Sequence, residues 1–201
     1  MGLLDDIINQ THQSAAKAVI NNVVIPKQLN DKFTNASNFT FGAEGGYTVD
    51  NGGPTNFGIT QKTLDAYNKK YNKPMTDVRT IKPEYAKNIA KSEYFDAPGY
   101  GNYPTNIAAA LFDFGFNAGT GRSTQLLQKI VGAKPDGING PKTQALVNNY
   151  ISKFGEQALL QNFTDGIKNH YVNITNGEDP KVRRNGYMNR VTNLKKMLNV
   201  R

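Results

Sequence analysis

Apolar residues recur with a helical period over most of this 201-residue chain. In residues 3–24, pairs of apolar residues repeat about every four positions until Pro26 ends the pattern. Residues 106–117 (NIAAALFDFGFN) are almost wholly apolar, which predicts a buried central helix. The segments with a helical pattern are residues 3–24, 60–67, 80–95, 106–117, 122–131, 141–154, 156–176 and 186–198. The chain is therefore predicted to be mainly α-helical.

Capping residues and prolines mark several helix ends. Thr60 is the predicted N-cap of the helix that follows it, and Thr80 that of the next helix, which has Pro83 in its first turn. Pro141 begins a later helix after a turn. Residues 27–38 are polar, which predicts a linker or a short helix that enters the next domain.

The glycine-rich stretch 41–60, FGAEGGYTVDNGGPTNFGIT, departs from the helical pattern. Its Asp-Asn-Gly-Gly sequence at residues 50–53 is a strong turn signal, so two short strands are expected to flank it. Glu44 comes directly before two glycines, at the end of an apolar lead-in. A lone glutamate in such a place is more often an N-cap or a solvated charge. A hairpin does not require a carboxylate there, however, and glycines let the backbone lie close to a ligand.

Asp113 is a carboxylate inside the apolar segment 106–117. A carboxylate in an apolar helix must be hydrogen-bonded or paired. Two roles are open for it. It bonds backbone groups or Arg122 as a structural residue, or it serves as a ligand.

Charge and composition narrow the classes of function. The formal net charge is +8, which favours an anionic partner, but no run of five basic residues exists, so a nucleic-acid-binding arm is disfavoured. The chain has no cysteine, which excludes disulfides and thiolate metal sites. Its two histidines, His12 and His170, are far apart in sequence, so neither a metal site nor a Ser-His-Asp triad is supported. We expect no metal and no cofactor.

Several motifs occur in an order and at spacings that resemble the N-acetylmuramidases of glycoside hydrolase family 108, which are lysozyme-like and common among bacteriophage endolysins. The resemblance covers residues 39–198. Its motifs are E-G-G-Y at 44–47, G-G-P-T-N-F-G-I-T at 52–60, E-Y-F at 93–95, F-D-F-G-F-N-A-G at 112–119, L-L-Q at 126–128 and D-G-I-N-G-P-K-T at 136–143. The run G-Y-M-N-R-V at 186–191 is similar to the family's Gly-Trp-x-x-Arg-Val, with Tyr187 in place of tryptophan.

The resemblance implies an α+β lysozyme-like fold, in which a helical bundle surrounds the buried central helix and a small hairpin lobe lies next to the catalytic glutamate. It divides the chain into an N-terminal helix and linker, residues 1–38, and a muramidase domain, residues 39–201. A catalytic lobe takes about residues 39–117 of that domain. Residues 118–201 resemble a peptidoglycan-binding segment, which we expect to form one body with the catalytic lobe.

The implied activity is cleavage of the β-1,4 bond between N-acetylmuramic acid and N-acetylglucosamine in peptidoglycan, with Glu44 as general acid. An apolar site would raise the pKa of such an acid by penalising its charged form. The family's acidic loop is shorter here, which leaves Asp50 as the nearby second carboxylate, and the Thr55 hydroxyl could position a water in its place. Sugar rings have apolar faces and hydroxyl rims, so the candidate substrate contacts are aromatic and amide side chains: Tyr47, Asn56, Tyr94, Tyr103 and Asn117. For each tyrosine, packing in the core or at its rim stays open as the alternative role.

Two other functions stay open: a lytic transglycosylase that uses the same glutamate, and a non-catalytic wall-binding or virion structural protein. The expected partners are peptidoglycan, an anionic cell-envelope surface and, through the N-terminal helix, a virion component. We expect a monomer that binds no nucleic acid. The acidic N-terminus MGLLDDIINQ is unlike a classical export signal. We therefore expect synthesis in the bacterial host cytoplasm and action on periplasmic peptidoglycan, through a holin pore or as part of the virion.

Overall fold

The computed structural model describes residues 27–42, 46–50, 53–175 and 183–200. Contacts divide the chain into two units, Met1–Asp31 and Lys32–Arg201. The described part of the first unit is the beginning of helix α2 (Lys27–Gly42), and everything below concerns the second unit. The predicted helix at residues 3–24 lies outside the described residues. Helix α2 runs without a break through positions 38 and 39, where the sequence suggested a domain boundary.

The glycine-rich stretch forms a small antiparallel sheet of the strands β1 (Thr48–Asp50), β2 (Gly53–Asn56) and β3 (Ile59–Thr60), in that order. The predicted strands on either side of residues 51–52 pair with each other, with Asp50 opposite Gly53. A two-residue turn joins β2 to β3. Both of its residues, Phe57 (φ 49°) and Gly58 (φ 74°), have positive φ, as a type I′ turn requires. Glycine is at home there, whereas a phenylalanine is an outlier.

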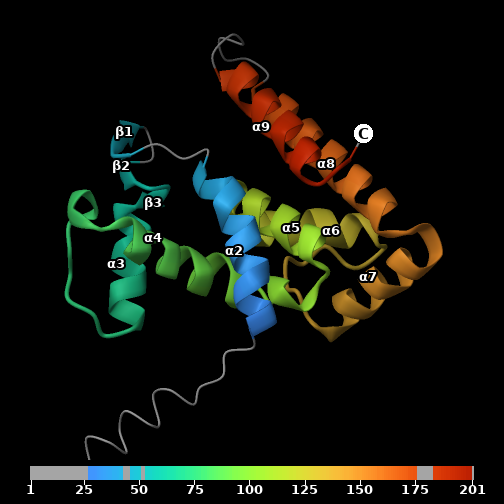
Figure 1. The fold of residues 1–201 in the computed structure, drawn as a ribbon, viewed down its shortest axis with the longest axis horizontal. Helices are drawn as coiled ribbons and strands as arrows, with labels where there is room; N and C mark the ends of the chain where they lie inside the picture. Colours follow the sequence, from blue (N-terminus) through green and yellow to red (C-terminus); the bar gives the residue numbers. More distant parts are fainter. Residues whose placement is uncertain (1–26, 43–45, 51–52, 176–182, 201) are drawn as a thin grey trace, which may run out of the picture. The chain divides into compact units, whose positions relative to one another are not determined.

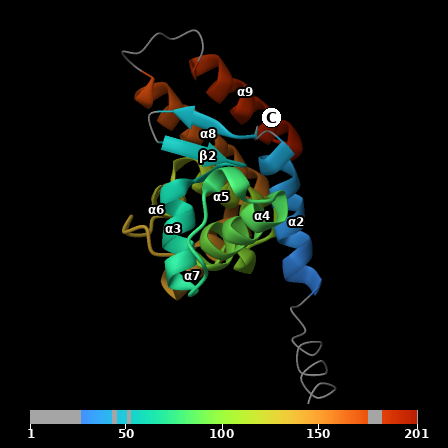
Figure 2. The same ribbon diagram turned by 90° about the vertical axis from the view of Figure 1, so that its left-hand side faces the viewer.

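Short helices complete this part of the chain: α3 (Gln61–Lys70), the 3₁₀ turn η1 (Val78–Thr80) and α4 (Pro83–Ala90). Thr60 caps the N-terminus of α3, as predicted. Its hydroxyl accepts a 3.1 Å hydrogen bond from the Thr63 amide. These elements close over their own apolar cluster: Ile59, Leu64, Tyr67, Val78, Ile81, Ala86 and Ile89. Figure 2 shows the strands running across the end of α3.

The remaining helices are η2 (Lys91–Asp96, a π-helical stretch), η3 (Tyr100–Asn102), α5 (Thr105–Ala118), α6 (Thr120–Ile130), α7 (Pro141–Phe154), α8 (Glu156–Ile174) and α9 (Arg183–Met197). Helix α5 is the predicted central helix, with nine consecutive buried residues from Ile107 to Gly115. It contacts η2, η3, α6 and α8. In Figure 1 it passes between α3 and α4 on one side and α7 and α8 on the other.

One apolar cluster contains residues from both sides of position 118, among them Phe112 on α5, Leu127 on α6, Phe163 on α8 and Leu194 on α9. The C-terminal helices therefore share the core of α5. The predicted fold class, mainly α with a small β-hairpin lobe, is confirmed. None of the described helices is long and apolar enough to cross a membrane.

Two predictions about single residues were wrong. Thr80 does not cap α4, whose cap residue is Lys82 without a side-chain hydrogen bond; the Thr80 hydroxyl instead donates to the Asp77 carbonyl. Arg122 does not pair with Asp113, because its guanidinium donates to the Ala118 carbonyl one turn away on the helix surface. Asp113 finds its partners on other elements, as described below.

Candidate active site

For two of the three candidate catalytic residues, Glu44 and Asp50, the side chain lies outside what the structure describes. Glu44 lies outside the described residues, and in the sequence it follows Gly42, the last residue of α2, by two positions. Asp50 is the last residue of β1, where its backbone is described. The site is therefore built here from the elements that precede and follow Glu44 in the chain.

An aromatic cluster lies at the C-terminal end of α2. The ring centroid of Phe41 is 5.4 Å from that of Phe116 on α5, which in turn meets Tyr94 of η2 edge-on at 5.2 Å. Phe41 and Phe116 are partly buried and pack against both apolar clusters of the domain. Tyr94, a candidate sugar contact, is thus a partly exposed ring supported by Phe116. Helix α2 therefore ends against an apolar surface, two residues before Glu44 in the sequence.

Threonines lie side by side across the sheet that follows. Thr48 of β1 is opposite Thr55 of β2, and Thr55 is opposite Thr60 of β3. Directly opposed residues project to the same face of a sheet, so the three hydroxyls share one face. Among the described residues, the Thr55 hydroxyl makes one hydrogen bond, a long one of 3.4 Å to the Gly53 carbonyl. It is therefore able to bind a water or a substrate hydroxyl, as the candidate role requires.

The first strand carries exposed apolar side chains. Tyr47, just before β1, is 45% exposed, and Val49 is 65% exposed. Arg79 is in η1, which packs against β2 of the same sheet. Its hydrogen bonds to Asp77 are the main cause of its raised pKa, and the Tyr47 ring contributes a smaller electrostatic effect. The same Arg79 bonds lower the pKa of the Asp77 carboxyl to about 2, so both groups stay charged over the working pH range.

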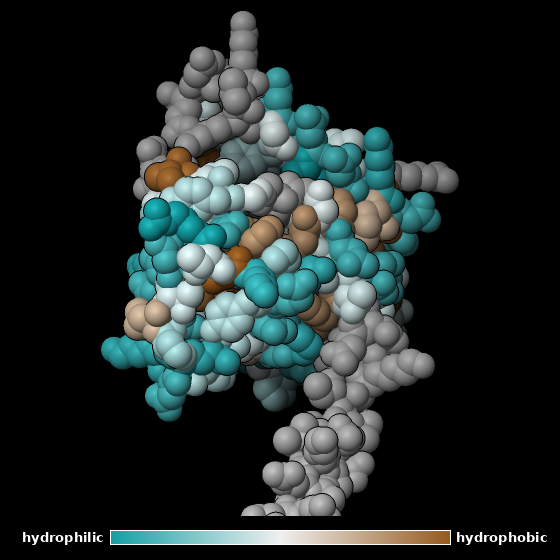
Figure 3. All heavy atoms as spheres, turned by 60° about the vertical axis from the view of Figure 1, so that its left-hand side comes forward, coloured by the Kyte–Doolittle hydropathy of each residue, from teal (hydrophilic) through white to brown (hydrophobic). Residues whose placement is uncertain are grey.

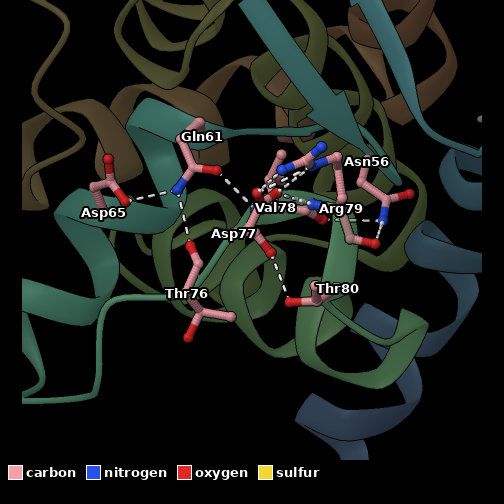
Figure 4. A network of polar contacts seen from close by, with 8 residues as sticks. All are labelled: Asn56, Gln61, Asp65, Thr76, Asp77, Val78, Arg79 and Thr80. Atoms are coloured by element: carbon pink, nitrogen blue, oxygen red, sulfur yellow. Dashed lines mark hydrogen bonds and ion pairs between the residues drawn. The ribbon is translucent and has the colours of Figure 1, made fainter.

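A polar network holds η1 against the sheet and α3 (Figure 4). The Asn56 amide donates to the carbonyls of Val78 (3.0 Å) and Arg79 (3.4 Å), and the Val78 amide donates to Gln61 at 2.7 Å. Asn56 is 5% exposed. Its amide nitrogen is thus used for hydrogen bonds inside the domain. Asn56, a candidate sugar contact, therefore has a structural role in holding η1 against the sheet.

Tyr103 is removed from the candidate sugar contacts. Its ring is 1% exposed, and its hydroxyl donates to the side-chain carbonyl of Asn139. Burial raises the pKa of Tyr103 to about 12, with the Asn139 bond acting in the opposite direction. A ring that no solvent reaches cannot stack on a sugar. Core packing, the other role considered for this tyrosine, is the one that it has.

Asn117, the last candidate contact, is exposed at the C-terminal end of α5, where its amide donates to the Asp113 carbonyl at 2.7 Å. It lines a hollow together with Phe39 of α2 and residues of α9: Gly186, Tyr187, Asn189, Arg190 and Asn193. These α9 residues were not among the candidates. The only sequence signal for them was the Gly-Tyr-x-x-Arg-Val run, which marks the helix without indicating which face it turns inward.

An ion pair fixes this end of the domain. The Arg190 guanidinium is 2.6 Å from one carboxylate oxygen of Asp113 and 3.3 Å from the other, and the Thr40 hydroxyl donates to the same carboxylate at 3.0 Å. Helices α2, α5 and α9 therefore meet at a single buried carboxylate. Asp113 is a structural residue, as one of its two predicted roles required, with partners that are remote in sequence.

Among the described residues, no three histidine, aspartate or glutamate side chains are grouped as a metal ion would require. His170 is in α8, where burial and, to a smaller extent, the charge of Arg122 lower its pKa. It packs edge-on against Phe114 with ring centroids 5.4 Å apart.

Part of the chain is similar to a known protein family. A family model described as Glycosyl hydrolase 108 matches residues 37–119, which run from α2 through the sheet to the end of α5. The inferred family resemblance is confirmed over this segment. The match supports a glycoside hydrolase of the lysozyme-like kind that acts on peptidoglycan. The segment includes Glu44 and the aromatic cluster described above, whereas α6 to α9 lie beyond it.

A solved structure supports the fold over more of the chain. The structure of Brucella abortus SagA is 26% identical in sequence, with a TM-score of 0.70. The similarity covers 85% of this chain and 95% of that one. No curated protein matches the chain. The helices beyond residue 119 thus belong to a fold seen elsewhere, while a peptidoglycan-binding role for them stays a prediction.

Proposed function

We propose that the protein is a muramidase, which hydrolyses the β-1,4 bond between N-acetylmuramic acid and N-acetylglucosamine, and that Glu44 is its general acid. The observation that carries the proposal is the family match over residues 37–119, because it spans Glu44 together with the elements on both sides of it. Glycoside cleavage passes through an oxocarbenium-like transition state and requires a proton on the leaving oxygen. Glu44 is the carboxyl group that would supply it.

The environment of α2 supports this role for Glu44. Phe41, Phe116 and Tyr94 form an apolar surface at the helix end from which the chain continues to Glu44. A carboxyl group beside such a surface is poorly solvated when charged, and its pKa rises as a result. A general acid that is to be protonated near neutral pH needs that shift. The aromatic cluster would therefore serve both as packing and as the cause of the shift.

The second catalytic role is proposed for Asp50 or Thr55. As a nucleophile, a carboxylate would lie about 5–5.5 Å from the acid, and as a base that activates water, about 6.5–9.5 Å away. Thr55, whose hydroxyl donates a long 3.4 Å hydrogen bond to the Gly53 carbonyl, would position the attacking water instead. The single substitutions Asp50→Asn and Thr55→Val separate these roles. The variant that lacks the required group should lose most of the lytic rate, and the other should keep it.

The surface of the domain suits a carbohydrate. On the face that Figure 3 shows, apolar side chains appear as small separate patches between polar ones. A glycan strand offers the same alternation, with apolar ring faces and hydroxyl edges. The net charge of +8 would add a general attraction to the anionic cell envelope.

Lysis of outer-membrane-permeabilised Gram-negative cells tests the proposal. Glu44→Gln keeps the size of the side chain and removes its proton, so we expect the lytic rate to fall by about 10²–10⁴-fold. Glu84→Gln is the matched control, because Glu84 is an exposed glutamate in the first turn of α4, and its rate should equal that of the wild type. Wild-type lysis by Glu44→Gln would refute the assignment.

A further inference from the structure

The hollow between α2, α5 and α9 has the features of a ligand site. It has a volume of about 370 Å³ and is lined by Phe39, Asn117, Gly186, Tyr187, Asn189, Arg190 and Asn193. Ligand pockets start at about 300 Å³, so the space suits a small group such as one sugar residue. Its lining combines carboxamides with aromatic rings.

The carboxamides come from two helices. Asn189 and Asn193 are four positions apart on α9, so they lie on the same face, and both are exposed. Among the residues that the structure describes, neither side chain has a hydrogen-bond partner. Asn117 uses its amide nitrogen on the Asp113 carbonyl, which leaves its side-chain oxygen as an acceptor. Each carboxamide can both donate and accept, as an acetamido group can.

The aromatic rings are held in place by their own contacts. Tyr187 stacks on Tyr171 of α8, with ring centroids 4.3 Å apart and an angle of 8° between the planes. Phe39 is partly buried and packs against the main apolar cluster. Rings fixed in this way offer an apolar surface to a sugar without a large loss of side-chain entropy on binding.

The three helices that line the hollow are joined to one another by the Asp113–Arg190 ion pair and the Thr40 hydrogen bond. The Asp113 side chain is 3% exposed and that of Arg190 is 13% exposed. The asparagines at the rim are thus attached to helices that cannot easily move apart.

The hollow includes a residue of α2, the helix that precedes Glu44 in the chain. Phe39 is three positions before the end of α2 and five before Glu44 in the sequence. In Figure 1 the C-terminal end of α2 lies between the sheet and α9. A glycan strand that passes over this end of α2 would meet the sheet on one side and the asparagines of α9 on the other.

We propose that this hollow is a sugar subsite for an N-acetylated residue of the glycan strand, and that Asn189 and Asn193 recognise its acetamido group. The proposal rests on the proposed function and adds a specificity determinant from α9, outside the segment that the family model matches. Tyr187 and Phe39 would contact the apolar part of the sugar, and Asn117 would accept a hydrogen bond from it.

The test compares two soluble tetrasaccharides with the same β-1,4 linkage. The chitin tetrasaccharide carries an acetamido group at C2 of each sugar, and the cellulose tetrasaccharide carries a hydroxyl there. Binding is measured by NMR titration of the backbone amides. We expect the wild type to prefer the chitin tetrasaccharide by about 10-fold, the worth of one or two hydrogen bonds. The double variant Asn189→Ala/Asn193→Ala should lose that preference.

The matched control is Asn169→Ala/Asn173→Ala, a second pair of exposed helical asparagines four positions apart, on α8 in a different hollow. It should keep the wild-type preference. Both double variants should fold, since alanine is favoured over asparagine in a helix. The inference is wrong if the α9 variant keeps the preference, if the control loses it equally, or if the wild type binds neither tetrasaccharide.

These outcomes are independent of the lysis test. If Glu44→Gln stops lysis but the acetamido preference does not depend on α9, the muramidase proposal stands and the subsite does not. If the preference depends on α9 but Glu44→Gln lyses cells normally, the hollow binds sugars on a protein with a different catalytic residue or none.

Discussion

The Asp113 carboxylate and the Arg190 guanidinium lie 2.6 Å apart although 77 positions separate them in the chain. The pair joins the central helix α5 to the last helix α9, at a depth where the aspartate side chain is 3% exposed. Loss of one partner from a buried pair leaves the other charge uncompensated. The stability of the domain should therefore depend strongly on this contact.

We predict that Arg190→Met lowers the free energy of unfolding by about 3–5 kcal/mol. The double variant Asp113→Asn/Arg190→Met should lose less than the sum of the two single variants, because no buried charge is left alone. Urea unfolding measures all three. The pair Lys70–Glu93, whose lysine is exposed, is the control, because an ion pair open to solvent contributes little and Lys70→Met should cost far less than Arg190→Met. Equal losses at both pairs would contradict this view of Asp113.

Two glycines at the start of α6 should respond in opposite directions to alanine. Gly119, between α5 and α6, has φ 96° and ψ 137°, a conformation that a side chain rarely adopts, so Gly119→Ala should cost about 1–3 kcal/mol. Gly121 is inside the helix with no atom within 4 Å of an added Cβ, and Gly121→Ala should stabilise by up to about 1 kcal/mol. Thermal unfolding of both variants decides, and a shift of the same sign in both would contradict the prediction.

Stability at alkaline pH should report on Tyr103. Burial raises its pKa to about 12, whereas an unfolded tyrosine has a pKa of about 10. Between these values the unfolded state has lost the proton and the folded state retains it, so the free energy of unfolding falls as the pH rises. Below about pH 10 both states keep the proton, so the contribution of Tyr103 to the free energy of unfolding is fully present.

Tyr103→Phe should remove this part of the alkaline loss, and at neutral pH it should cost about 1 kcal/mol through the lost bond to Asn139. Tyr100, whose pKa burial also raises, should leave a residual slope. Urea unfolding at a series of pH values gives both curves. If the curves of wild type and variant run parallel between about pH 10 and 12, Tyr103 titrates at its ordinary value.

Local patterns in the sequence predicted much of the fold. The apolar segment 106–117 became α5, Thr60 capped α3, and the Asp-Asn-Gly-Gly turn signal marked the pairing of β1 with β2. Each of these depends on interactions within a few residues, which is the range that periodicity, capping and turn preferences cover. The helices with the strongest apolar period were located within a few residues of their observed ends.

Contacts between remote elements were not predictable in the same way. Asp113 was expected to bond backbone groups or the nearby Arg122, but its arginine is Arg190, which only packing of α9 on α5 brings close. Tyr103 stands in a loop rich in glycine and proline, a composition typical of the surface, yet its ring is in the core. Asn56 was a candidate for sugar binding because amides bind sugars, and the same amide serves equally well to hold η1.

The central claim is that Glu44 delivers the proton in a hydrolytic cleavage after N-acetylmuramic acid. Mass spectrometry of the fragments that the wild type and Glu44→Gln release from purified peptidoglycan tests it most directly. The account predicts fragments with N-acetylmuramic acid at the reducing end from the wild type, and none from Glu44→Gln. Anhydro-muramic products would make the reaction a transglycosylation, and reducing-end muramic acid released by Glu44→Gln at the wild-type rate would contradict the role of Glu44.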